Sequence, residues 1–161
     1  MGIGQAAAMR FAQEGAKVVV FDIAEKEGYE TEETLRQCEP QCLFFPGDVT
    51  KESDWQEVMH IIETVYGRLD ILFNNAGTNL IKRVTEVTET EWDRIITINL
   101  KGVFFGAKYS LSLMLKSGGG SIINSASTTA LIALPKMPVY SASKGGIFSA
   151  HAPARLRLRI T

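Results

Sequence analysis

Short apolar segments alternate with longer helical segments along most of this chain, and this alternation constrains its fold more than any other feature. Strands joined by helices form βαβ units, in which the strands run parallel and the helices cover both faces of the sheet. The sequence therefore predicts one doubly wound α/β domain over residues 1–161, a length typical of a single domain. The strand-like segments are 16–21, 43–45, 69–73 and 121–124, and the predicted helices are 5–14, 25–36, 53–66, 89–116 and 139–152.

Local signals place several of these boundaries. Gly15 suits the end of the first helix, and 89–116 contains a break near Asn99. Capping boxes are predicted where a hydroxyl residue is followed three positions later by Glu or Gln, as in Ser53 with Gln56 and Thr88 with Glu91.

Tryptophans are interpreted as core anchors rather than as ligand platforms. Trp55 begins an apolar helical stripe with Val58, Ile62 and Val65, and Trp92 lies on the next predicted helix.

Composition excludes several functional classes. A net charge of −1 and a pI near 6.1 give no general attraction to nucleic acid or anionic membranes. The longest apolar runs are too short to span a bilayer, and the start does not resemble a signal peptide. We expect a cytoplasmic protein. Cys38 and Cys42 lack the spacing of a metal or redox pair, so free thiols and no metal site are predicted.

Polar residues follow the predicted strands. In open parallel sheets, ligands bind beyond the carboxyl ends of the strands. Just after strand ends come Asp22, Asp48, Asn75, Ser127 and, through its helix, Tyr140. The pattern predicts that these residues cluster.

Tyr140 and Lys144 are four residues apart, so on a helix their side chains share a face. A nearby ammonium group favours the phenolate and makes a tyrosine more effective in proton transfer. A hydroxyl such as that of Ser127 could hold a substrate carbonyl. By itself the spacing is also typical of a solvated pair that contributes little.

Five further motifs occur in a fixed order. They are Gly2-Ile3-Gly4, Asp22 after the strand-like segment 16–21, Gly47-Asp48-Val49, Asn74-Asn75-Ala76-Gly77, and Asn99 in Ile-Asn-Leu-Lys-Gly. With Ser127, Tyr140 and Lys144, they resemble the short-chain dehydrogenase/reductase family, over the chain to about Ser149. The resemblance implies a Rossmann-like fold.

The resemblance also implies the function of these residues. Tyr140 would transfer a proton to or from the substrate oxygen, with Lys144 tuning it and gripping the nicotinamide ribose. Ser127, which lies 13 residues before the tyrosine and is therefore favoured over Ser125, would bind the substrate oxygen. Asn99 would position a water. Cofactor contacts would come from Gly2, Ile3, Gly4, Asp22, Asp48, Val49, Asn75, Ala76, Gly77, Tyr140 and Lys144.

Asp22 bears on which cofactor is used. Its carboxylate can accept hydrogen bonds from ribose hydroxyls but repels a 2′-phosphate, and Phe21, Ile23 and Ala24 supply no cation. NAD(H) is predicted, acting on a small alcohol or ketone.

Both ends depart from the family pattern. Met1 falls within the Gly-rich loop, so the resemblance predicts a chain truncated at both ends, without the family's first strand and its C-terminal strands. Loss of the first strand would leave the strands at 16–21 and 69–73 without backbone partners. The tail from Ala154 alternates arginine with apolar residues, as a nucleic-acid or membrane patch could, but with only three arginines it is interpreted as the end of a truncated or frame-shifted gene product.

Alternatives remain open. One is a non-catalytic fragment or dinucleotide-binding module, and another is a 3-oxoacyl-carrier-protein reductase, a class that commonly uses NADPH. Family members usually form homodimers or homotetramers, which truncation puts in doubt. Leu131, Ile132 and Leu134 would either line the substrate pocket or pack against the sheet.

Overall fold

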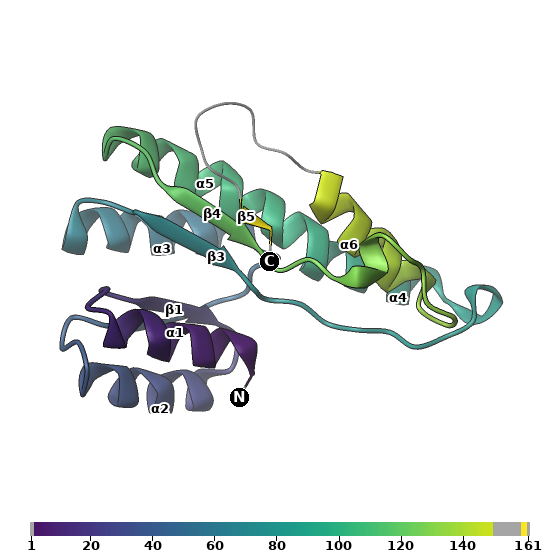
Figure 1. Cartoon of the computed structure of the whole chain (residues 1–161), viewed down its shortest axis with the longest axis horizontal. Coiled ribbons are helices and arrows are strands. Elements are labelled where there is room, and N and C mark those ends of the chain that lie inside the picture. The colour runs from purple at the N-terminus through teal and green to yellow at the C-terminus, as the bar shows by residue number, and fades with distance from the viewer. Residues whose placement is uncertain (1, 150–158, 161) are drawn as a thin grey trace.

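A computed structural model of the protein describes residues 2–149 and 159–160, and the following description concerns these residues. Strands and helices alternate as predicted (Figure 1). The strands are β1 (Val19–Asp22), β2 (Leu43–Pro46), β3 (Ile71–Asn74), β4 (Ser121–Asn124) and β5 (Arg159–Ile160). The helices are α1 (Ile3–Gln13), α2 (Glu25–Arg36), α3 (Glu52–Tyr66), α4 (Glu89–Ile96), α5 (Gly102–Lys116) and α6 (Pro138–Ser149). Short helical turns η1 (Val84–Glu86), η2 (Thr97–Lys101) and η3 (Thr128–Ala130) complete the set.

The strands form two separate parallel sheets. β1 pairs with β2, with Val19 opposite Leu43. β3 pairs with β4, with Ile71 opposite Ser121, and β5 adds a short third strand beside β4. The prediction of parallel strands is confirmed. Among the described residues, β1 and β3 each form the edge of their sheet and are not paired with each other.

Apolar side chains pack on both faces of β1. On one face, Val18 and Val20 contact a cluster centred on Ala12 and Leu35, which come from α1 and α2. On the other face, Val19 and Phe21 pack against a cluster supplied by α3 and α5. Alternate residues of a strand point to opposite faces. Helices on both faces confirm the doubly wound arrangement.

The start of α3 differs from the prediction. Lys51 is the N-cap, without a side-chain cap, and Ser53 instead donates a hydrogen bond from Oγ to Asp54 Oδ1 at 2.8 Å. The Ser53–Gln56 capping box is therefore wrong. Glu52 and Asp54 lie in the first turn, where negative charge is favoured by the helix dipole.

The prediction of a core position is confirmed for Trp55 but is wrong for Trp92 and Val65. Trp55 is buried, and its Nε1 donates to the Val49 carbonyl at 2.9 Å, as expected of a core anchor. Trp92 is 45% exposed and Val65 is 55% exposed. Both positions have helical periodicity, but neither side chain is buried once the helices are packed.

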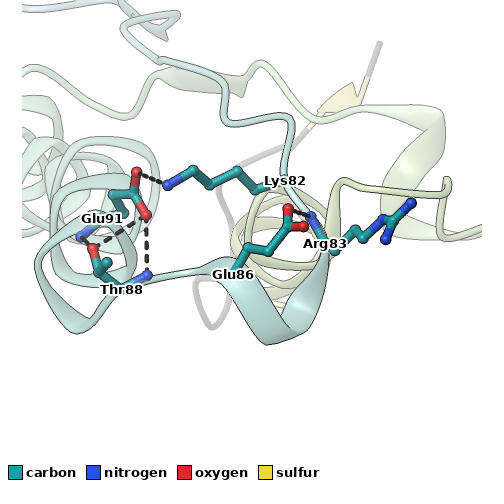
Figure 2. A network of polar contacts seen from close by, with 5 residues as sticks. All are labelled: Lys82, Arg83, Glu86, Thr88 and Glu91. Atoms are coloured by element: carbon teal, nitrogen blue, oxygen red, sulfur yellow. Dashed lines mark hydrogen bonds and ion pairs between the residues drawn. The ribbon is translucent and has the colours of Figure 1, made fainter.

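The start of α4 is held by a polar network (Figure 2). Thr88 accepts a hydrogen bond from Glu91 N, and the Glu91 carboxylate accepts one from Thr88 N at 3.0 Å, which confirms this capping box. Lys82 forms an ion pair with Glu91 at 2.6 Å. The Lys82 ammonium, together with the Thr88 N–H, lowers the pKa of Glu91 to about 2. The loop after β3 is thereby tied to α4.

The two cysteines are both free thiols, as predicted. Cys38 is exposed, but Cys42 is buried in the cluster below β1, where burial raises the pKa of its thiol. Of the helices in residues 2–149, none combines the length and the apolar character needed to cross a bilayer.

Candidate active site

The carboxyl ends of β3 and β4 are joined by a buried side-chain hydrogen bond. Asn74 Nδ2 donates to Asn124 Oδ1 at 2.9 Å. Each residue closes its strand, so the bond fixes the point from which the loops after β3 and β4 depart. Both loops carry predicted site residues.

The first group of predicted cofactor residues surrounds the start of α1. Gly2 is the N-cap of this helix, and the free N–H groups of a helix start favour an anion. A Cβ on Gly4 would lie 2.6 Å from Asn75 Nδ2, so a larger residue here would require the Asn75 side chain to move. Gly2, Ile3, Gly4, Asn75 and Ala76 all line one cavity of about 920 Å³.

Asp22 lines the same cavity from the carboxyl end of β1. Its Oδ1 accepts a hydrogen bond from Ala24 N at 3.0 Å, which orients the carboxylate. The side chain is exposed, so the carboxylate is accessible to a polar ligand.

Asp48 and Val49 follow β2. Asp48 Oδ1 accepts from Thr50 N at 2.8 Å, and Asp48 N donates to Asp54 Oδ2 at 2.9 Å. Val49 lines the cavity, whereas Asp48 is not among the lining residues. The side chain of Asp48 thus shapes its own turn.

Asn99 occupies a π-helical turn, η2, between α4 and α5. This confirms the predicted break in the long helix, and π turns are frequent at functional sites. Its side chain is fully buried. Oδ1 accepts from Thr78 N at 2.8 Å, while Nδ2 donates to Thr78 O at 2.9 Å and to Ser143 Oγ at 3.1 Å.

Lys144 and Tyr140 lie on one face of α6, as the spacing predicts. Lys144 Nζ is 5.8 Å from the centre of the Tyr140 ring, and it donates to the Ser125 carbonyl at 2.6 Å. Lys144 is only 5% exposed, and burial lowers the pKa of its ammonium group. The cation is held by a neutral acceptor, which leaves its charge uncompensated by this contact.

Gly77 lies close to both Asn99 and Lys144. A Cβ at this position would lie 3.3 Å from Asn99 Oδ1 and 3.7 Å from Lys144 Nζ.

Ser127 is the N-cap of η3. Its Oγ accepts hydrogen bonds from Thr129 N at 3.2 Å and from Thr129 Oγ1 at 2.9 Å. Because α6 packs against η3, Ser127 and Tyr140 come from adjoining elements.

Three residues that hold the site were not predicted. Thr78 binds both ends of the Asn99 amide, Ser125 accepts from Lys144, and Ser143 links Asn99 to the Tyr140 carbonyl, to which its Oγ donates at 2.7 Å. Ser143 is the second serine of Tyr-Ser-Ala-Ser-Lys, three residues after Tyr140, so helical spacing was the available signal. Thr78 and Ser125 act through their backbone groups, so their residue types gave no signal in the sequence.

The fold and site define a class: a Rossmann-like α/β protein with polar residues gathered at the carboxyl ends of its parallel strands. The chain matches the short chain dehydrogenase family over residues 1–158. It therefore belongs to this family.

Individual relatives agree with this membership. An uncharacterized oxidoreductase of Thermotoga maritima is 42% identical over 91% of this chain and 57% of its own length. The NAD-dependent glycerol dehydrogenase of Listeria innocua is 38% identical over 92% of this chain and 57% of its own. The crystal structure of NAD⁺-bound xylitol dehydrogenase superimposes with a TM-score of 0.88 at 30% identity, covering 91% of this chain and 57% of that one. The chain thus spans less than two thirds of the length of these proteins.

Proposed function

We propose that this chain carries the NAD(H)-binding and proton-transfer residues of an oxidoreductase that interconverts an alcohol and a carbonyl. The observation that carries the proposal is the placement of the buried Lys144 ammonium beside Tyr140, with Asn99 and Gly77 packed around it. A buried ammonium group whose pKa is shifted, beside a phenol, is more typical of a functional site than of a purely structural contact.

The residues around the start of α1 suit a dinucleotide. The N–H groups at Gly2–Gln5 can bind a pyrophosphate, and the exposed Asp22 carboxylate can accept from ribose hydroxyls. A bound nicotinamide supplies or accepts the hydride. Of the relatives above, one is named as NAD-dependent and another was solved with NAD⁺. NAD(H) is favoured over NADP(H) because residues 21–24 carry a carboxylate and no cation.

Proton transfer is assigned to Tyr140. Its hydroxyl donates a proton to the carbonyl oxygen during reduction and takes it back during oxidation. The neighbouring Lys144 cation favours the phenolate, so it makes this exchange easier. Ser127 Oγ, at the start of η3, donates a hydrogen bond to the same substrate oxygen. Asn99 is a positioning residue, because Thr78 and Ser143 already occupy its amide.

The substrate is proposed to be a small alcohol or ketone with an apolar portion. Leu131, Ile132 and Leu134 follow η3 and are 69%, 73% and 49% exposed, so they are not buried against the sheet. They are available to form an apolar wall beside Ser127.

A non-catalytic dinucleotide-binding module is the second candidate. It is favoured by the separation of β1 from β3, since α1 and Asp22 are attached to one sheet and Lys144 contacts the loop after the other. In that case the chain binds the cofactor without bringing it to Tyr140.

A titration of the purified chain with NADH, followed by fluorescence, tests cofactor binding, which both candidate functions require. Turnover is then measured with a panel of short alcohols and ketones. Saturable binding with turnover is expected; binding without turnover identifies the module. The absence of both contradicts the proposal.

A further inference from the structure

A lysine occupies a strained backbone position just before the helix that carries Tyr140. Lys136 has a φ of 62°, and in the part of the chain that the structure describes it is the one residue other than glycine with a positive φ. This left-handed region is uncommon for residues with a Cβ and is populated mainly by Gly, Asn and Asp. The backbone at this position therefore disfavours the lysine that it holds.

The strain comes from a tight turn ahead of α6. Met137 N donates to the Leu134 carbonyl at 3.2 Å, with Pro135 and Lys136 at the two central positions. Proline at the first and a positive φ at the second are the features of a type II turn, in which glycine is usual at the second position. The turn leads directly into α6, whose first turn carries Tyr140.

The backbone of this turn is tied to the loop after β3. Lys82 N donates to the Lys136 carbonyl at 2.7 Å. The loop after β3 is itself held on α4 by the ion pair between Lys82 and Glu91 (Figure 2). A backbone carbonyl is present in every residue type, so this bond does not explain why the position holds a lysine. The exposed side chain is what distinguishes Lys136 from a glycine.

Two unpaired cations belong to these two bonded segments. Arg83 directly follows Lys82, and neither Arg83 nor Lys136 forms an ion pair with any residue that the structure describes. The nearby carboxylates are used elsewhere: Glu86 accepts from Arg83 N, and Glu91 pairs with Lys82. Figure 2 shows the Arg83 side chain extending away from both carboxylates. Like charges on adjoining segments repel, and a bound anion would offset this repulsion.

The turn lies between the two residues assigned to the substrate oxygen. Ser127 caps η3 at one end of this connection, and Tyr140 begins α6 at the other. Lys136 follows Ser127 and precedes Tyr140 on the same connection, which packs η3 against α6. A cation at this position therefore borders the place where the substrate is proposed to bind.

Exposed apolar side chains adjoin the cation. Leu131, Ile132 and Leu134 belong to the same connection, and Ile81, which is 66% exposed, precedes Lys82 in the loop after β3. A ligand at this rim meets positive charge beside apolar surface. This combination suits a small organic anion better than a neutral molecule.

We propose that Lys136 binds a carboxylate group of the substrate, so that the substrate is an oxo acid or a hydroxy acid. Arg83 adds positive potential at the same rim. A lysine ammonium group is a flexible point charge on a four-carbon stem, and its hydrogen bond to a carboxylate is charge-assisted. The strained backbone is retained because this side chain acts on a ligand. The inference rests on the proposed function, because it assigns the anion to the molecule whose oxygen meets Ser127 and Tyr140.

Titration calorimetry of the purified chain with levulinate, a ketone that bears a carboxylate, and with its neutral amide tests the proposal. Levulinate should bind about tenfold more tightly, because a hydrogen bond between two charged groups is stronger than its neutral counterpart. The preference should shrink as salt is added. Equal affinity for the two compounds, or binding of neither, overturns the proposal.

Substitutions of Lys136 separate the charge from the backbone strain. Lys136→Gly and Lys136→Asn remove the cation and suit a positive φ, so both should raise the midpoint of thermal unfolding by about 2 °C and abolish the preference for levulinate. Lys136→Arg keeps the charge and should retain most of the preference. A preference that survives in Lys136→Asn shows that another cation binds the carboxylate. An unchanged midpoint in Lys136→Gly shows that no strain is present; either result overturns the proposal.

Lys26→Asn is the matched control. Lys26 is exposed on α2 and forms no ion pair with a described residue, so its replacement removes one cation from a helix without a positive φ. It should leave both the preference for levulinate and the thermal midpoint of the original chain unchanged. If it weakens the preference as much as Lys136→Asn does, the effect is one of net charge and the proposal is wrong.

Failure of this inference is distinguishable from failure of the proposed function. A chain that binds NADH and reduces levulinate and its amide equally well retains the proposed function and overturns the inference. A chain that prefers levulinate through Lys136 but does not bind NADH supports the anion site and contradicts the proposed function. Dihydroxyacetone phosphate replaces the carboxylate by a phosphate; if it binds more tightly than levulinate, the site belongs to a phosphate ester and the carboxylate is overturned.

Discussion

Asn99 and Ser143 are joined by a hydrogen bond of 3.1 Å, although 44 residues separate them in the sequence. The bond connects the π turn after α4 to the helix that carries Tyr140 and Lys144. Ser143 Oγ also donates to the Tyr140 carbonyl. A buried polar chain of this kind fixes the position of α6 relative to the loop after β3.

Replacing Ser143 by alanine should lower the free energy of unfolding by about 1 kcal/mol, because one donor of the buried Asn99 amide loses its partner. Ser141→Ala is the matched control. Its Oγ is buried and has no hydrogen-bond partner among the described residues, so its removal should change stability by less than about 0.5 kcal/mol. Urea unfolding followed by circular dichroism measures both. Equal losses would show that the Asn99 contact contributes nothing specific.

Tyr140→Phe should reduce turnover by about 100-fold or more, the usual contribution of a general acid or base. NADH affinity should stay within about twofold, since only the hydroxyl is removed. Tyr29→Phe, on the outer helix α2, is the control and should behave like the original chain. Steady-state rates and fluorescence titration give the two quantities. If Tyr140→Phe and Tyr29→Phe turn over equally, Tyr140 is not the proton donor.

The combined change Asp22→Ser and Ile23→Arg should shift the preference from NADH towards NADPH. It removes the carboxylate that repels a 2′-phosphate and adds a guanidinium group at a position that is 70% exposed. Parallel titrations with the two cofactors measure the ratio of dissociation constants, which we expect to change by at least about tenfold. Asp22→Ser alone should weaken NADH binding without improving NADPH binding. An unchanged ratio in the double variant would remove Asp22 from the cofactor site.

Glu91 predicts an acid-side loss of stability. Its pKa is lowered to about 2 from an ordinary value of 4.5, chiefly by Lys82. A carboxyl with a depressed pKa stabilises the folded state above its ordinary value, and this contribution is lost as the pH falls from about 4.5 towards 2. Glu91→Gln keeps an acceptor for the capping box but loses the charge, so the thermal midpoint should fall less steeply over this range.

Glu89→Gln is the comparison for this experiment, because Glu89 also lies in the first turn of α4. It should retain the steep acid-side loss of the original chain. Identical pH profiles for Glu91→Gln and the original chain would mean that the charge of Glu91, with its contacts in Figure 2, does not stabilise the fold.

The sequence by itself determined the elements whose signals are local. The bounds of α2 match the prediction, and the Thr88–Glu91 capping box was found because both partners lie within one turn. The shared face of Tyr140 and Lys144 follows from helical spacing, and the family was identified from the order of its motifs. Interactions between near neighbours are recorded in residue type and spacing.

Tertiary structure alone decided the rest. It left Trp92 and Val65 exposed, since periodicity predicts an apolar face but not what covers it. It paired Lys144 with the Ser125 carbonyl and Asn99 with Thr78, contacts that involve backbone groups and so carry no residue signature. It also left β1 and β3 facing one cavity. Which segments approach one another depends on the packing of the whole chain, because the free energy of burying a surface depends on its neighbours rather than on its sequence.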